Sequence, residues 1–299
     1  MTDNIKGAGL MTLSMLTFAI NDAFIKSLGG VVPVFQTLTL RTGMTLVLLC
    51  IYVSVTGWSV GPTTWREKGL IGLRTLSEIG AAYFIVTALF HMPLANITAI
   101  LQMLPLSVPL AALIVLREPL GWQRLAAIAV GFLGMLLIVQ PGAGGFTDYS
   151  LYGVAAVICV TIRDITARSL RAQISPGVLS VFVACGVFVF SGAMALTEPF
   201  VPVPPQGWIG LIGSAVAIMV GYIVSVSAIR HGDVSFTAQF RYTGLLAALV
   251  LGYVFFGEWP NALTLLGACI VVCMGLFTLY RERQVRMITQ PVDSSGDSP

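Results

Sequence analysis

Charged residues are scarce in this chain. Only 10% of its 299 residues are Asp, Glu, Lys or Arg, whereas 57% are hydrophobic and the mean hydropathy is +0.91. Soluble domains contain about 25% charged residues. The chain therefore lacks the polar surface that would cover a water-soluble particle, and the sequence predicts an integral membrane protein embedded in a lipid bilayer. It also lacks a basic run typical of nucleic-acid binding.

Residue types that serve catalysis or bind metals are also few. The only histidines, His91 and His231, fall at the ends of apolar segments, and neither His-Glu-x-x-His nor Gly-x-Ser-x-Gly occurs. The five cysteines lie in apolar stretches without partners that would complete a metal site. We therefore expect no catalytic residues, no metal and no cofactor. An intramembrane enzyme or a membrane scaffold remains an alternative to a transporter.

Long apolar segments predict an all-α membrane protein with ten transmembrane helices. A bilayer core of about 30 Å requires about 20 apolar residues per helix, and Gly- and Pro-containing turns separate the segments. The expected spans are 7–28, 34–57, 69–90, 94–116, 122–140, 150–170, 177–197, 207–229, 234–257 and 262–280. Residues 281–299 are expected to form a disordered cytoplasmic tail.

The distribution of basic residues predicts the orientation. With the amino terminus placed inside, the outside loops hold only Lys26. The inside segments hold the remaining loop cations, namely Lys6, Arg66, Lys68, Arg117, Arg124, Arg168, Arg171, Arg230, Arg281, Arg283 and Arg286. Because cytoplasmic loops are enriched in Lys and Arg, both termini are expected to face the cytoplasm, with the protein in the plasma (inner) membrane.

Seven charged residues lie well inside the expected spans, more than two residues from either end. A charge at the bilayer centre costs about 2.5–3.5 kcal/mol on insertion scales, so these groups must pair with one another or face a wet cavity. An internal charged cavity is most typical of a transporter. The seven are Asp22, Glu78, Asp164, Arg41, Arg74, Arg163 and Arg241.

Glu78 is expected to be the deepest of these charges, about 2 Å from the midplane at 1.5 Å per residue. Arg74 lies one turn away on the same helix face and would hold Glu78 ionised. Glu78 is therefore a candidate site for a proton or a substrate amino group, or else half of a static ion pair. Asp22 and Arg41 have similar depths and are expected to face each other across the first two spans.

The remaining candidates are polar groups of the fourth, sixth and ninth spans. Arg241 is a candidate partner for a substrate carboxylate, and Gln102, Gln239 and Tyr242 either bind substrate or bond neighbouring helices. Asp164 is expected to face Arg168 one turn on, as a gate or packing pair, and to point away from Arg163. Pro105 and Pro109 predict a bent fourth span, either as a hinge or as a static kink.

The two halves of the sequence resemble each other. Asp22-Ala-Phe-Ile-Lys-Ser-Leu28 aligns without insertion on Asp164-Ile-Thr-Ala-Arg-Ser-Leu170, and Arg117-Glu-Pro-Leu120 corresponds to Gly257-Glu-Trp-Pro260. Each half has five spans, so the second half enters the membrane from the opposite side. Inverted repeats of this kind are typical of transporters with a site at the repeat interface.

With these motifs the chain resembles the drug/metabolite transporter superfamily, in its ten-helix form with two EamA-type domains. The resemblance rests on Asn21-Asp22-x-x-x-Lys26, Arg41, and the segments 93–102, 117–124 and 131–141. It implies five-helix repeats at 7–140 and 150–280, and a secondary carrier for a small molecule without an ATPase domain. One departure is that Asp164 follows Arg163, whereas Asp22 follows Asn21.

Relatives in this superfamily move amino acids, other metabolites and drugs. A secondary carrier built from two inverted repeats is expected to work by alternating access, with proton coupling as one option. A cavity with both Glu78 and Arg241 suits a small zwitterion, so the first expectation is an exporter of amino acids or related metabolites. The alternative is uptake of a vitamin or nucleoside-like metabolite, of the riboflavin or S-adenosylmethionine type.

Overall fold

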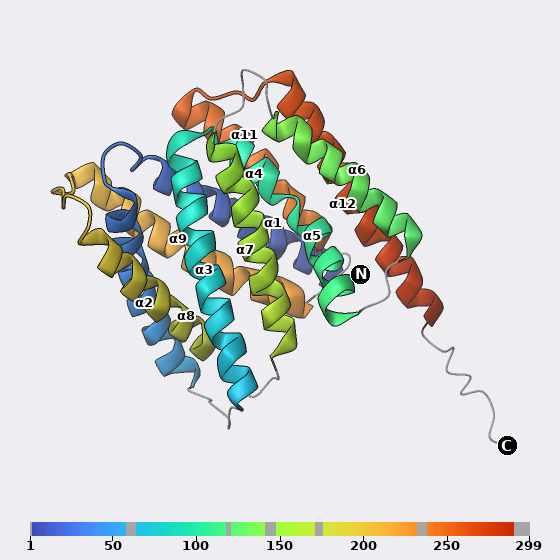
Figure 1. Ribbon diagram of the computed structural model, residues 1–299, viewed down its shortest axis with the longest axis horizontal. Helices are drawn as coiled ribbons and strands as arrows, with labels where there is room; N and C mark the ends of the chain where they lie inside the picture. The colour runs from blue at the N-terminus through green and yellow to red at the C-terminus, as the bar shows by residue number, and fades with distance from the viewer. Residues whose placement is uncertain are drawn as a thin grey trace.

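The computed structural model describes residues 2–57, 64–117, 121–140, 148–170, 176–231 and 238–289. Within them it is all-helical, with ten candidate membrane spans, as the sequence predicts (Figure 1). The first half contains α1 (Thr2–Lys26), α2 (Val34–Thr56), α3 (Trp65–His91), α4 (Leu94–Leu101), α5 (Leu104–Ala111), η1 (Ala112–Leu116) and α6 (Trp122–Val139). The second contains α7 (Asp148–Ser169), α8 (Pro176–Ala195), α9 (Pro205–His231), η2 (Ala238–Tyr242), α11 (Thr243–Phe256) and α12 (Ala262–Thr289).

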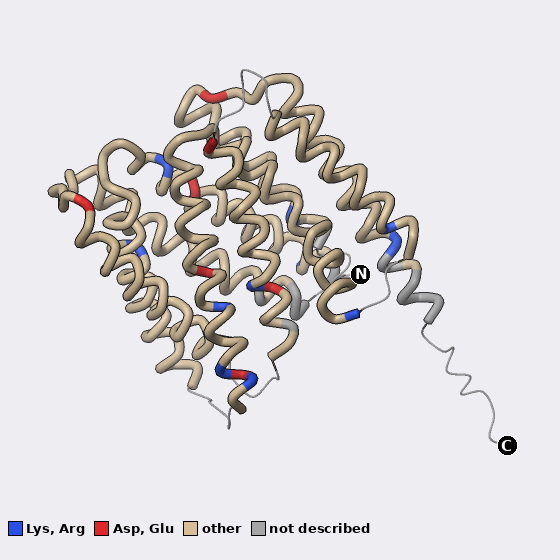
Figure 2. The backbone as a smooth tube through the Cα atoms, viewed as in Figure 1, with Lys and Arg blue, Asp and Glu red and all other residues tan. Residues whose placement is uncertain are grey.

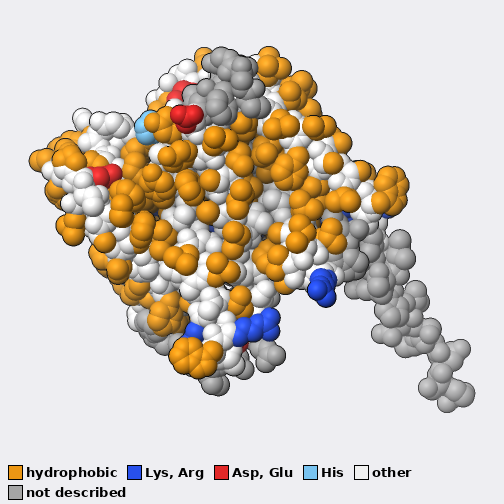
Figure 3. Space-filling view, viewed as in Figure 1, with side chains coloured by type: hydrophobic (Ala, Val, Ile, Leu, Met, Phe, Trp, Pro, Cys, Tyr) orange, Lys and Arg blue, Asp and Glu red, His pale blue; other side chains and the backbone are white. Residues whose placement is uncertain are grey.

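The outer surface of the bundle is apolar. Large hydrophobic side chains such as Val47 and Ile51 of α2, and Val250 and Val254 of α11, are exposed. Figure 3 shows hydrophobic side chains across the middle of the visible face, with the visible charged groups near its ends. Helices that are apolar on all sides belong in a membrane, so the protein is a multi-pass membrane protein.

Two of the spans are interrupted. The fourth breaks at Gln102 and Met103 between α4 and α5, and it ends as the π-helix η1. Pro105 lies at the start of α5 and Pro109 inside it, where each lacks the backbone N–H that a continuous helix uses. The ninth span, as far as the structure describes it, begins as the 3₁₀-helix η2 before α11. A bent fourth span was expected; its role as a hinge stays a prediction.

Helix packing follows the inverted repeat. The first helix of each half packs on the third helix of the other half. Thus α1 packs on α9, and α7 packs on α3 (Figure 1). The pairs α2–α8 and α6–α12 each join the same helix of the two halves. The aligned Arg117 and Gly257 both adopt left-handed conformations, with φ of 56° and 63°. The two halves therefore share local geometry as well as sequence.

The last helix is longer than the sequence suggests. Residues 281–289, expected to be disordered, continue α12 to Thr289, because Arg281, Arg283 and Arg286 are good helix formers that extend the helix past its apolar part. Residues 290–299 and Glu118 lie outside the described residues, as does the side chain of Arg168.

Candidate functional site

A cavity of about 360 Å³ lies between the two halves of the bundle. The first half contributes α1 to α5, and the second contributes α7, α9, η2 and α11. Its size is within the range of small-molecule sites, about 300–1,000 Å³. Its charged and polar lining consists of Asn21, Asp22, Arg41, Glu78, Thr98, Gln102, Arg163, Tyr222, Ser225 and Arg241. None of the described lining residues is Trp.

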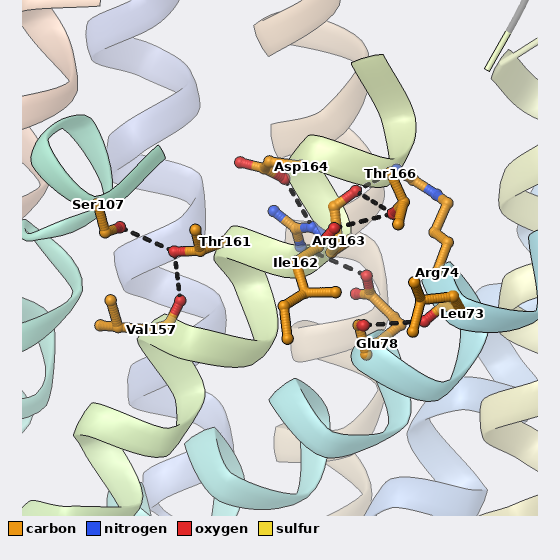
Figure 4. A network of polar contacts seen from close by, with 11 residues as sticks. Leu73, Arg74, Glu78, Ser107, Val157, Thr161, Ile162, Arg163, Asp164 and Thr166 are labelled. Atoms are coloured by element: carbon orange, nitrogen blue, oxygen red, sulfur yellow. Dashed lines mark hydrogen bonds and ion pairs between the residues drawn. The ribbon is translucent and has the colours of Figure 1, made fainter. Parts of the chain in front are cut away.

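Glu78 is paired with Arg163, not with Arg74. Nη1 of Arg163 lies 3.4 Å from Oε2 of Glu78, joining α7 to α3 (Figure 4). Arg74 instead donates from Nη1 to the carbonyl of Arg163 at 3.3 Å. Arg74 is not among the cavity-lining residues. The long Arg74 side chain reaches across to α7, so the role expected of Arg74 falls to Arg163.

Asp164 also contacts Arg163, which corrects the expectation that the two point apart. Nε of Arg163 lies 2.9 Å from Oδ1 of Asp164. Adjacent helical residues start from different faces, but the flexible arginine side chain folds back over the helix and overcomes that separation. Arg163 therefore lies between two carboxylates, as Figure 4 shows, and forms with Glu78 and Asp164 an ion network across the repeat interface. The three side chains are 22–34% exposed, so the network is wetted.

A second polar cluster lines the cavity at α1 and α2. Nδ2 of Asn21 donates to Oδ1 of Asp22 at 2.8 Å, and Arg41 is the cation that acts most strongly on Asp22. Asp22 and Arg41 line the same cavity, and the expectation that they face each other stays a prediction. Tyr222 of α9 lines the same cavity.

The other candidates divide between the cavity and the helix interfaces. Gln102, Pro105 and Arg241 line the cavity, and the Arg241 side chain is exposed there. Tyr242 is buried against α12, with its ring over Gly275, and does not line the cavity. Gln239 is likewise not among the lining residues.

Lys26 makes several polar contacts near the α1–α2 turn, next to the cavity-lining residue Ile25. Its Nζ lies 3.0 Å from Oε1 of Glu258, and it donates to the carbonyls of Leu89 and Met92 at 3.3 and 2.6 Å. Oε2 of Glu258 accepts from the backbone N–H of Leu94 at 3.1 Å. Lys26 thus joins α1, the end of α3 and the loop before α12, rather than pairing with Asp22 on its own helix.

Sequence reasoning omitted Asn21, Arg163 and Tyr222 from the site. Arg163 could have been predicted as a site residue, because it is an arginine inside an expected membrane span. Asn21 belonged to the family motif but was read only as a neighbour of Asp22. Tyr222 gave no signal, since tyrosine in an apolar span is ordinary, and only the packing of α9 on α1 brings it to the cavity.

Ten membrane spans around a charged cavity at a repeat interface define the class of multi-pass membrane carriers. The model of the EamA-like transporter family matches residues 5–140 and 149–280. This match covers most of the chain, and the protein therefore belongs to that family. Membership confirms the resemblance to the drug/metabolite transporter superfamily and identifies a transporter, not an enzyme.

Relatives of this chain are named for several different substrates. The chain is 25% identical over 290 residues to the S-adenosylmethionine uptake transporter of Rickettsia prowazekii (strain Madrid E), covering 94% of each chain. It is 26% identical over 282 residues to the pseudopaline exporter CntI of Pseudomonas aeruginosa (strain UCBPP-PA14), covering 90% of this chain and 95% of that one. It is 26% identical over 281 residues to the riboflavin transporter of Vibrio cholerae serotype O1 (strain ATCC 39315 / El Tor Inaba N16961), covering 93% and 94%.

A solved crystal structure, described only as that of a protein, shares the fold. Its TM-score is 0.64 at 19% identity, and the alignment covers 95% of this chain and 99% of the other.

Proposed function

We propose that the protein is a secondary active transporter of the inner membrane that moves a small organic metabolite by alternating access. An amino acid or related metabolite is the first substrate class, and export is the first direction. Both termini would face the cytoplasm. The observation that carries this proposal is the cavity between the repeats, which is lined by both acidic and basic side chains.

The polar lining favours a solute with charged groups. Asp22 and Glu78 are acids, whereas Arg41, Arg163 and Arg241 are bases, and all five line one cavity. Apolar residues such as Ile25, Ile85 and Val86 form part of the same wall. A small zwitterion with an apolar portion fits both kinds of surface, because charges inside a membrane protein are favourable only when they are paired or hydrated.

The two ends of the cavity support an inward-facing state. The Lys26–Glu258 contact would hold shut the end that faces the outside, whereas Arg241 is exposed on the expected cytoplasmic side. In alternating access the halves rock about a central site. The outer contacts of Lys26 would then break as the cavity opens outward.

Flux in proteoliposomes tests this proposal. Wild-type protein is expected to exchange a radiolabelled amino acid, S-adenosylmethionine or riboflavin against the same unlabelled compound, and the labels are tested one at a time. Glu78→Gln removes a charge from the network at nearly constant shape and should reduce this exchange at least tenfold. Thr56→Val, an exposed position in α2, serves as the matched control. Absence of exchange for every metabolite in a broad panel would contradict a carrier function.

Uptake is the alternative direction, because similar relatives are named for uptake and for export. Everted and right-side-out vesicles carrying an imposed proton gradient distinguish the two directions. Export predicts accumulation in everted vesicles, whereas uptake predicts accumulation in right-side-out vesicles.

A further inference from the structure

We propose that Asn21, Asp22 and Arg41 form a head-group site that binds the ammonium and carboxylate groups of an α-amino-acid moiety. The site rests on the proposed carrier function and adds to it the residues that would recognise the head group of the substrate. All three residues line the cavity on neighbouring helices of the first repeat.

Asn21 supplies a buried acceptor without a partner. Its side chain is 5% exposed, and Oδ1 has no hydrogen-bond partner among the described residues. The orientation of the carboxamide is fixed, because Nδ2 must face the carboxylate of Asp22, to which it donates at 2.8 Å. A buried carbonyl oxygen left unpaired is costly. An ammonium group of a bound solute would satisfy it.

Asp22 lies beside that acceptor. One of its oxygens accepts from Asn21, and a carboxylate has several further acceptor positions. An ammonium group has three donors. Asn21 Oδ1 and Asp22 together therefore offer a neutral and a charged acceptor to the same cation.

Arg41 supplies the complementary donor. Its Nε is buried and has no hydrogen-bond partner among the described residues, and its charge acts on Asp22. A guanidinium group binds carboxylates through parallel N–H donors. Acceptors for an ammonium group and a donor for a carboxylate thus lie in one part of the cavity, which matches the two groups carried by an α-amino acid.

The cluster of Glu78, Arg163 and Asp164 is less available for binding a solute. Arg163 already binds Glu78 and Asp164, and Arg74 donates to the Arg163 carbonyl. A solute that bound there would have to break existing ion pairs. The ring of Tyr222, which contacts Phe18 edge to face with centroids 5.4 Å apart, instead forms a wall that can contact the remainder of the solute.

Binding by solutes that differ only in the head group tests the assignment. The probes are S-adenosylmethionine, L-methionine and L-phenylalanine, and the methyl ester and N-acetyl derivative of each serve as forms that lack one charged group of the head. At least one free amino-acid probe is expected to raise the melting temperature of the purified protein and to be exchanged in proteoliposomes. Its blocked counterpart should bind at least tenfold more weakly.

Variants locate the site. Asn21→Ala and Arg41→Lys are each expected to weaken the free probe about tenfold to hundredfold, as loss of hydrogen bonds to charged groups predicts, with little effect on the blocked forms. Asn96→Ala is the matched control, since it removes another buried, unpartnered carboxamide oxygen that does not line the cavity. Elution of each variant as a monodisperse peak with a wild-type melting temperature confirms folding.

Three outcomes would overturn the head-group site. Equal binding of free and blocked probes would do so, as would the loss of free-probe binding in Arg241→Ala but not in Arg41→Lys. Exchange of riboflavin but of no amino-acid probe would also reject the head-group site, while leaving the carrier function intact. Failure to exchange any solute rejects the carrier function itself.

Discussion

Arg163 neutralises two carboxylates from two helices. It contacts Glu78 of α3 at 3.4 Å and Asp164 of its own helix at 2.9 Å. The cost of a charge inside the membrane is reduced only when such partners are present. The network therefore contributes to the packing of α3 on α7 as well as to the polarity of the cavity.

Arg163→Met is expected to destabilise the protein more than Arg74→Met. The first change leaves two acids without their cation, and loss of one partner of a buried pair typically costs about 3–5 kcal/mol. Because the network is partly hydrated, we expect about 3 kcal/mol. Arg74→Met removes only a hydrogen bond to a carbonyl. Melting temperatures of both variants in one detergent measure the difference, and equal losses would contradict the central role of Arg163.

Sequence analysis located the charged residues but not all their partners. Depth along a helix follows from residue counting, which is why Asp22, Arg41 and Glu78 were expected in the interior, and all three line the cavity. Partners across helices depend on helix rotation and on the reach of arginine side chains. Helical spacing alone therefore wrongly favoured Arg74 for Glu78 and separated Arg163 from Asp164.

Small residues set the distance between α6 and α12. A Cβ placed on Gly134 would lie 3.0 Å from the carbonyl oxygen of Gly267, and one on Gly267 would lie 2.5 Å from that of Gly134. Close approach of this kind is how membrane helices associate without a hydrophobic driving force. Close packing of α6 on α12 thus explains Gly134 and Gly267.

Gly267→Ala is expected to lower stability by about 1–3 kcal/mol, the usual cost of overpacking, because the new methyl group would meet backbone. Gly72→Ala is the matched control in α3. It has open space around it and should be neutral or stabilising by up to about 1 kcal/mol. Thermal unfolding in detergent compares the two. A stable Gly267→Ala variant would show that α6 and α12 separate without cost.

The helices were more predictable than their interruptions. Length and hydropathy alone indicated all ten spans, because the bilayer imposes a minimum apolar length. Pro105 and Pro109 predicted irregularity in the fourth span, and the break occurs just before Pro105. The 3₁₀-helix at the start of the ninth span carries no proline in its described part, and sequence offered no sign of it.

The orientation of the whole protein is testable by labelling. Basic residues gather towards the lower end of the bundle in the view of Figure 2, where α3 begins. In a cysteine-free background, Lys68→Cys should react with a membrane-impermeant maleimide only from the cytoplasmic side, and Ser27→Cys only from the outside. Both side chains are exposed at opposite ends of the bundle. The reverse labelling pattern would invert the proposed topology.

Weakening the outer closure is expected to shift the conformational equilibrium. Lys26→Gln removes the ion pair with Glu258. It also weakens the two hydrogen bonds that join α1 to the end of α3. Thr98→Cys, which lines the cavity, should then label from outside about tenfold faster, equivalent to about 1.4 kcal/mol.

The exposed Lys68→Gln is the control for this change. Unchanged labelling in the Lys26→Gln variant would show that Lys26 does not hold the cavity closed.

The Lys26–Glu258 pair bridges the first repeat to the second, and its lysine is only 9% exposed. In the proposed topology, opening toward the outside would break this bridge and the hydrogen bonds of Lys26, which favours a closed outer end in the unloaded protein. A bound solute can shift the protein to the outward-open state only if it binds that state more tightly than the inward-open state. The same bridge that holds two helices together would thereby limit futile leakage across the membrane.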